Sequence, residues 1–242
     1  QLGVGFSEFF GSRDESNLIF SNNTVTGKTY FVLDIDYSSH VMLSDSKGQI
    51  GIVEIGAPGI ECNALITVDK TRIFTEMNFK NTEIDILEKT KNSSEAISNA
   101  VDAGRIVIAA DSIGASKAML DKAVEYSKER KQFNRVIGSF QAVKHMCAEM
   151  ASELEPCYSL VWHAAHSFDN NEENRKLMAC HAKSHVSDVS KMVSKKATEV
   201  HGGMGFTDLL GLHFWFKRIG VNRHLLGSPE IVRNEAAKIQ GL

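Results

Sequence analysis

The sequence is poor in residues that break helices and in residues that cross-link chains. It contains 3 prolines and 4 cysteines in 242 residues, and no two cysteines form a CxxC pair. Widely spaced cysteines argue against a disulfide framework and a cysteine zinc site, and they fit a reducing compartment. The N-terminus QLGVGFSEFF lacks the basic and apolar regions of a secretory signal. We therefore expect a cytoplasmic location.

Long apolar runs and a strong excess of one charge are also missing. No stretch of about 18 apolar residues is present, so we expect no membrane span. The net charge of -3 gives no support to nucleic-acid binding. With 43% hydrophobic residues the chain should nevertheless form a globular protein with a substantial core.

Two halves of the chain differ in pattern. Before about residue 90, short β-branched and aromatic runs alternate with turn residues, which is typical of antiparallel strands. SDSKGQI at 44–50 and APG at 57–59 predict turns between such strands. Later, apolar residues recur at spacings of three and four, which predicts helices. The expected fold is α+β, with an antiparallel β domain over residues 1–90 and an antiparallel four-helix bundle over 93–242.

The helical half also carries most of the basic residues, so we expect anion binding there. Ser139 is the expected N-terminal cap of the second helix, and Gly202 with Gly203 should end the third. The expected helices cover residues 95–129, 139–168, 174–201, 209–220 and 229–240.

Three runs in this half have the composition of ligand-binding segments. The first run covers residues 130–145 and reads RKQFNRVIGSFQAVKH. It places two arginines and an aromatic ring beside a helix start, which suits a phosphate joined to a planar ring. A solvated basic loop is the alternative. EVHGGMGF at 199–206 either lets a ligand approach the backbone or ends a helix. In GSPEIVRN at 227–234, Ser228 either contacts a ligand or caps the last helix, and we favour capping.

Metal binding is not expected. His181 and His185 lie four residues apart on a predicted helix, but no third ligand follows in the same register. Two such histidines are more often packing or surface residues.

Taken in order, the three runs resemble the acyl-CoA dehydrogenase family of flavoproteins, specifically from about residue 93 and only topologically before it. The resemblance implies a middle β domain, a C-terminal bundle through which subunits associate, and FAD bound between subunits. The family's N-terminal helical domain is expected to be absent from this chain. The implied reaction is α,β-dehydrogenation of an acyl-CoA thioester, as in fatty acid or steroid side-chain oxidation, with an electron-transfer acceptor as a further partner.

The resemblance also assigns site residues. Arg130 corresponds to the residue that reaches the FAD pyrophosphate of a neighbouring subunit, and Phe133 lies near the adenine. Arg105 matches a helix arginine near the acyl-CoA site. The expected cofactor-binding residues are Arg130, Gln132, Phe133, Gln141, Glu199, Gly202, Gly203 and Ser228.

The catalytic base is where the chain departs from the family. The family's glutamate position holds Leu226 here, and the alternative position, on the first bundle helix, holds Gly104. Neither side chain accepts a proton, and Asp102 or Glu230 would need another helical face or register to substitute. No catalytic residue is therefore identified.

Flavin-ring contacts also look reduced. The flavin-contacting strand corresponds to FVL at 31–33, and the family's Gly-rich loop corresponds to FSEFFGSRDE at 6–15. We expect a dehydrogenase subunit whose base lies on a related partner chain. The expected assembly is a hetero-oligomer with that chain or a homo-oligomer. The alternatives are a non-catalytic structural subunit and a flavin monooxygenase or oxidase of the same fold.

Overall fold

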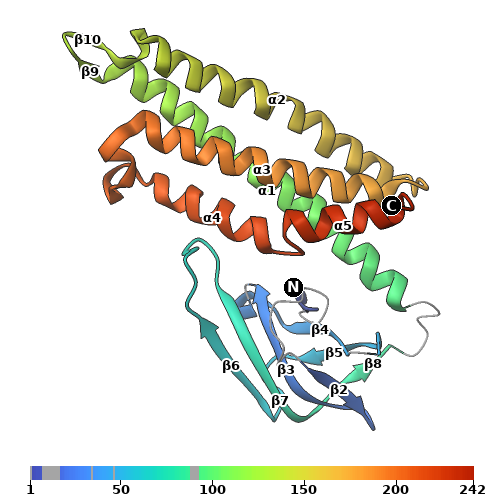
Figure 1. The fold of residues 1–242 in the computed structure, drawn as a ribbon. Coiled ribbons are helices and arrows are strands. Elements are labelled where there is room, and N and C mark those ends of the chain that lie inside the picture. The colour runs from blue at the N-terminus through green and yellow to red at the C-terminus, as the bar shows by residue number, and fades with distance from the viewer. Residues whose placement is uncertain (1, 7–16, 34, 46, 88–92) are drawn as a thin grey trace. The chain divides into compact units, whose positions relative to one another are not determined.

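The computed structural model describes residues 2–6, 17–33, 35–45, 47–87 and 93–242. The chain divides into two compact units, Gln1–Ala100 and Val101–Leu242 (Figure 1). Apart from Phe6, the segment FSEFFGSRDE expected to replace the Gly-rich loop lies outside the described residues. Among the described residues, no helix is long and apolar enough to cross a membrane.

The first unit contains two four-stranded sheets, ordered β1-β4-β5-β8 and β2-β3-β7-β6. Their pairings are antiparallel except that of β1 with β4, which is parallel. The expected antiparallel β domain is thus confirmed, with one parallel pair in addition. The strands are β1 (Leu2–Gly5), β2 (Leu18–Ser21), β3 (Thr24–Leu33), β4 (His40–Ser44), β5 (Ile50–Glu54), β6 (Ile60–Leu65), β7 (Phe74–Glu83) and β8 (Asp85–Ile86).

Both turns expected from the sequence are present. Between β4 and β5, the Asp45 carboxylate accepts hydrogen bonds from the backbone amides of Lys47 at 3.0 Å and Gln49 at 2.8 Å. Gly48 has a φ of 80°, which favours glycine. Between β5 and β6, Gly59 has a φ of 89°, and a Cβ there would lie 2.5 Å from the Lys80 carbonyl oxygen. The turn therefore requires glycine at this position.

The strand expected to contact flavin is irregular where FVL occurs. Phe31 has a φ of 59°, and the register of β3 with β7 shifts between Thr29 and Val32. Such a shift is the mark of a β-bulge, which re-aims side chains. The Phe31 ring accordingly lies edge-to-face on Phe74, with ring centroids 5.9 Å apart.

The second unit is a bundle of long helices, as expected (Figure 1). The chain ends α3 at His201, and Gly202 follows with a φ of 58°, so the predicted glycine stop is confirmed. α4 begins later than expected, after Gly211 in the left-handed region. The helices are α1 (Ser93–Glu129), α2 (Gln141–Asp169), α3 (Arg175–His201), α4 (Leu212–His224) and α5 (Pro229–Ile239).

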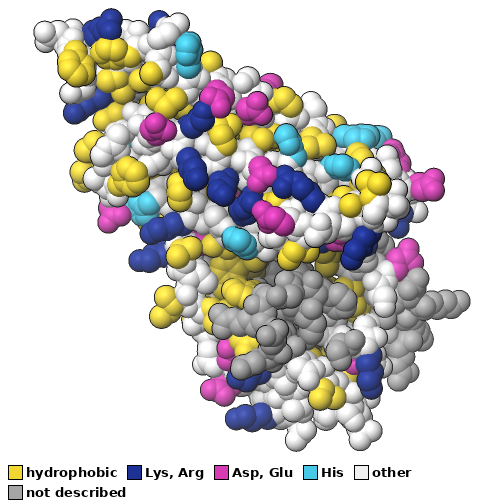
Figure 2. All heavy atoms as spheres, in the orientation of Figure 1, with side chains coloured by type: hydrophobic (Ala, Val, Ile, Leu, Met, Phe, Trp, Pro, Cys, Tyr) yellow, Lys and Arg dark blue, Asp and Glu magenta, His cyan; other side chains and the backbone are white. Residues whose placement is uncertain are grey.

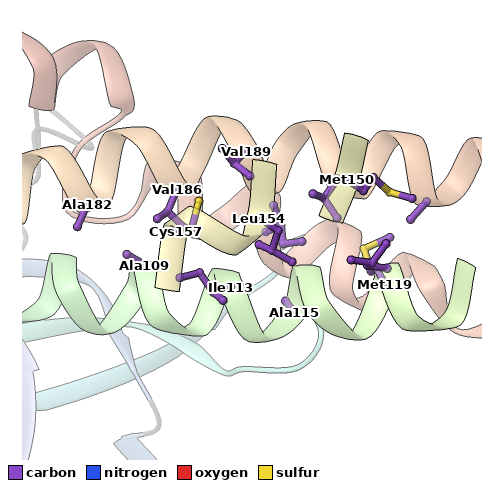
Figure 3. Close-up of a cluster of buried hydrophobic side chains, with 14 of the residues drawn as sticks. Ala109, Ile113, Ala115, Met119, Met150, Leu154, Cys157, Ala182, Val186 and Val189 are labelled. Carbon is purple, nitrogen blue, oxygen red and sulfur yellow. The ribbon is translucent and has the colours of Figure 1, made fainter. Parts of the chain in front are cut away.

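Buried hydrophobic side chains of α1, α2 and α3 pack against one another in the core of the bundle (Figure 3). α2 contributes a narrow buried stripe with Met150, Leu154 and Cys157 at spacings of four and three. Facing residues on α1 and α3 include Ala109 and Ala182. Interiors packed this tightly are sensitive to loss of volume.

Leu154→Ala should therefore lower the free energy of unfolding by about 2–5 kcal/mol, because Leu154 is only 2% exposed and its removal leaves a cavity. The measurement is chemical denaturation followed by far-UV circular dichroism. Leu209→Ala is the control, since Leu209 is 82% exposed and the change should stay within about 0.5 kcal/mol. Equal losses in both variants would contradict this picture of the core.

Candidate functional site

A cleft of about 570 Å³ opens where α1 and α3 end and α2 begins. The hairpin formed by β9 (Lys131–Gln132) and β10 (Arg135–Val136) lines one side. Figure 2 shows hydrophobic side chains beside Lys and Arg side chains at this end of the bundle. The lining residues are Tyr126, Arg130, Gln132, Phe133, Ile137, Phe140, Val143, Glu199, Val200, His201, Gly202, Gly203 and Met204.

The hairpin holds an aromatic side chain out from the surface. Phe133 and Asn134 form its two-residue turn, with φ values of 53° and 60°. Phe133 is 86% exposed, and its ring meets Phe140 edge-to-face at 6.1 Å. The Arg135 guanidinium also lies over the Phe140 ring, 3.9 Å from the ring centroid. This cation–π contact ties the hairpin to the start of α2.

The N-terminus of α2 has no side-chain cap, contrary to the expectation that Ser139 would provide one. The N-cap residue is Phe140, and the Ser139 hydroxyl instead donates to the Val136 carbonyl oxygen at 2.7 Å. Ser139 lies within the preceding 3-10 turn, one residue before the N-cap, and no side chain caps the start of α2. No acidic residue stands in the first turn of α2. Together with the nearby Arg130 guanidinium, this helix end favours an anion.

The glycines of the cleft leave its backbone accessible. A Cβ at Gly202 or Gly203 would meet nothing within 4 Å. Beneath them, the buried His201 ring stacks on Tyr126 with centroids 4.6 Å apart, and its Nδ1 lies 2.7 Å from the Ala197 carbonyl oxygen. Burial lowers the pKa of the His201 imidazole. The His201 imidazole therefore favours its neutral form beside these glycines.

A second site candidate lies at the turn between α4 and α5. Leu226 occupies the left-handed region with a φ of 59°. A Cβ built at Gly104 on α1 would lie 2.5 Å from Leu226 Cδ1. The two positions that the family resemblance assigns to the base are therefore neighbours here, and the Leu226 side chain lies over the glycine.

Arg105 connects this turn to a buried charged cluster. Its Nε donates to the Leu226 carbonyl oxygen at 3.0 Å, and its Nη2 donates to Glu235 at 2.8 Å. Arg105 Nη1 donates to Asp102 at 3.2 Å. Burial raises the pKa of Asp102 to about 6, against the opposing effect of the Arg105 charge. Glu230, by contrast, is exposed and pairs with Arg223 at 2.8 Å.

The structure brings most of the expected cofactor residues together but not all of them. Gln141 opens α2 and is not among the residues that line the cleft. Ser228 lies at the other site, where its hydroxyl accepts from the Ile231 amide at 3.5 Å as the cap of α5. The cleft contains Arg130, Gln132, Phe133, Glu199, Gly202 and Gly203.

Sequence reasoning missed Tyr126, Phe140 and His201 as parts of the cleft. A signal was available for Tyr126, because it precedes Arg130 by four residues and so shares its helix face. Across the described ranges, no three His, Cys, Asp or Glu side chains gather as metal ligands.

Gly203→Ala should leave the free energy of unfolding within about 0.5 kcal/mol of wild type, because the added methyl enters open space. Gly205→Ala should cost about 1–3 kcal/mol, because its Cβ would lie 2.6 Å from the Thr198 carbonyl oxygen. Urea denaturation of both variants measures the difference. A destabilised Gly203→Ala would show that the cleft is closed over this glycine.

Comparison with known proteins places this geometry in a family. The profile of the acyl-CoA dehydrogenase C-terminal domain matches residues 94–240, more than half of the chain. The caffeyl-CoA reductase-Etf complex subunit CarC of Acetobacterium woodii is 40% identical over 119 residues, which cover 49% of this chain and 31% of CarC. The chain spans about a third of the length of the curated relatives it matches.

Solved structures agree over the whole chain. Butyryl-CoA dehydrogenase from Megasphaera elsdenii has a TM-score of 0.89 at 22% identity, and the match covers 100% of this chain and 68% of that one. The steroid acyl-CoA dehydrogenase Tcur3481-Tcur3483 has a TM-score of 0.86 at 22% identity, covering 100% and 67%. At this identity the structures show the shared fold, and the profile match shows the kinship. The chain belongs to the acyl-CoA dehydrogenase family of flavoprotein oxidoreductases.

Proposed function

We propose that this chain is a subunit of an FAD-dependent acyl-CoA dehydrogenase and that a related partner chain supplies the catalytic base. The observation that carries the proposal is the contact of Leu226 with Gly104. The two sequence positions that would each place a carboxylate are neighbours, and an apolar side chain fills the space. The family's fold is kept while its proton acceptor is replaced by a hydrocarbon.

The cleft has features that fit the ADP half of FAD. The Arg130 guanidinium and the uncapped amides of α2 would hold phosphate oxygens through charge-assisted hydrogen bonds. The exposed Phe133 ring would stack on a planar base, and Gly202 and Gly203 leave room for close approach of the backbone. When bound, FAD supplies the oxidant that accepts hydride from the substrate. The chain's own residues in the cleft bind and orient it.

At the α4–α5 turn, the residues of this chain exclude water rather than move a proton. Leu226 places methyl groups over Gly104, and the neighbouring carboxyl group of Asp102 is bonded to Arg105. A general base must be within hydrogen-bond reach of the proton that it removes. Proton abstraction is therefore assigned to a partner.

Two relatives support a partner chain. CarC is a subunit of an Etf complex, and the steroid enzyme carries the names of two chains. The exposed Phe133 and Phe206, at 86% and 80%, lie at the cleft end of the bundle, where a second chain would cover them. Acyl-CoA is then the shared substrate, and an electron-transfer acceptor reoxidises the flavin.

A second candidate is a non-catalytic subunit of the same fold. The contact of Leu226 with Gly104 favours it equally, since a hydrocarbon at the base position is compatible with no chemistry at all. The two candidates differ in flavin content. An assembly purified with its partner chain and without FAD would support the non-catalytic subunit.

Arg130→Ala should weaken FAD binding by about 1.5–3 kcal/mol, the range for a lost hydrogen bond to a charged group. Isothermal titration of the flavin-free assembly with FAD measures the change. Arg175→Ala is the matched control, because Arg175 begins α3 at the end opposite Gly202. Equal affinities of Arg130→Ala and wild type would remove Arg130 from the proposed site.

The chain on its own should not bleach the visible flavin band when acyl-CoA is added, because a hydrocarbon side chain, Leu226, lies over Gly104 in place of a carboxylate. Co-expression with its related partner should restore bleaching, and mutation of a partner glutamate should abolish it again. Rapid-mixing absorbance spectroscopy makes the comparison. Turnover by the isolated chain would refute the divided site.

A further inference from the structure

The C-terminal end of α4 is closed by a lysine from another helix. Lys183 on α3 is 0% exposed, and its Nζ donates to the carbonyl oxygens of Asn222 at 2.7 Å and Arg223 at 3.1 Å. A third hydrogen bond reaches the Ser187 hydroxyl at 3.3 Å. The last carbonyls of a helix have no partner within it, and they carry its negative dipole end. Lys183 supplies both the donors and the positive charge that this end lacks.

Lys183 occupies an unusual electrostatic position. All three of its acceptors are uncharged oxygens. Burial, together with the nearby charges of Arg105 and Arg223, lowers the pKa of Lys183 to about 7. A buried cation without a carboxylate partner is costly, so its hydrogen bonds to the end of α4 must offset the cost of its burial.

The residues that Lys183 contacts are themselves anchored. The side-chain amide of Asn222 donates to Asp111 at 2.6 Å and to the Ser112 hydroxyl at 3.0 Å, both on α1. The end of α4 is thus fixed to α1 by Asn222 and to α3 by Lys183.

The turn that follows is held from its other side by Arg105, which donates to the Leu226 carbonyl oxygen at 3.0 Å. Within the turn, the Leu225 amide donates to Val221 at 3.1 Å and the Gly227 amide donates to His224 at 3.3 Å. Leu226 has a φ of 59°, a conformation that costs a non-glycine residue free energy and persists only where the surroundings impose it. Two buried basic side chains provide that constraint: Lys183 binds carbonyl groups just before the turn, and Arg105 binds one within it.

We propose that Lys183 is a positioning residue that, by holding the last carbonyl groups of α4, fixes the α4–α5 turn with Leu226 over Gly104. This inference deepens the proposed function, because residues 226 and 228 are those that the family resemblance places at the base and beside the flavin. The claim that Lys183 fixes the turn depends only on contacts among described residues of the bundle.

Hydrogen–deuterium exchange of the protein without flavin or acyl-CoA tests the proposal. In Lys183→Met, the amides of Leu225 and Gly227 should exchange about tenfold faster, because the turn opens when the carbonyls before it lose their donor. Amides of α3 around residue 183 should keep their protection. Lys191→Met is the matched control, an exposed lysine on the same helix, and should leave the turn unchanged.

A second variant separates positioning from general core damage. Glycine adopts the left-handed conformation without strain, so Leu226→Gly removes the need to impose it. The loss of thermal midpoint caused by Lys183→Met should be smaller in the Leu226→Gly background than in wild type. Should Lys183→Met fail to fold, Lys183→Gln, which keeps an amide donor, takes its place in both experiments.

Unchanged exchange at the turn would overturn the proposal, as would an increase spread equally over α3, or equal midpoint losses in the two backgrounds. Because neither assay contains flavin, these outcomes are independent of whether Arg130 binds FAD. If Lys183→Met loosens the turn as expected but the assembly does not bind FAD, the inference about Lys183 stands and the proposed function is rejected.

Discussion

Helix α3 is packed against α2, α4 and α5, so its polar side chains must find partners inside the bundle. Its hydroxyls do so locally: Ser184, Ser187 and Thr198 each donate to a carbonyl oxygen one turn earlier on α3, at 2.6–2.9 Å. These compact, self-satisfied residues allow close packing. Lys183 instead reaches across to α4, because its own helix offers its ammonium group only the Ser187 hydroxyl, whereas the end of α4 offers two backbone carbonyl oxygens.

The same helix organises both candidate sites. Its C-terminal end provides Glu199 and leads directly into Gly202 and Gly203 of the cleft, and its middle provides the amine that closes α4. A helix held in one position by the core gives both sites a rigid support, which is the condition for precise binding geometry. A displacement of α3 would therefore change the geometry of the cleft and of the α4–α5 turn together.

Local signals in the sequence predicted the elements because those signals act over a few residues. The glycine stop after His201 and the Asp45 turn are examples, since each is determined by contacts within one turn of chain. The parallel pairing of β1 with β4 brings residues 2–5 beside residues 40–43, and no local pattern specifies such a partner. Ser139 shows a different limit, because it lies in the 3-10 turn one residue before the N-cap Phe140, and its hydroxyl donates to the Val136 carbonyl oxygen.

The sequence predicted those site residues that lie at the ends of the helices, where the ends of different helices meet. Arg130 and Glu199 come together in the cleft because α1 and α3 end at the same end of the bundle. Ser228 belongs instead to the start of α5, where it caps the helix. Lys183 was missed because a lysine in an amphipathic helix ordinarily indicates the solvent-exposed face, and only the three-dimensional position of α4 reveals its acceptors.

The hairpin at the cleft has a thermodynamic consequence of its own. Phe133 stands at the tip of a two-residue turn whose φ values are already fixed, and Arg135 stacked on Phe140 braces its base. The conformational entropy of the Phe133 backbone is therefore lost when the protein folds, and none of it remains to be lost when a ligand binds. A molecule that stacks on Phe133 restricts little more than the two side-chain torsions of this residue. A larger share of the free energy of the contact therefore appears as binding affinity than for a ring on a flexible backbone.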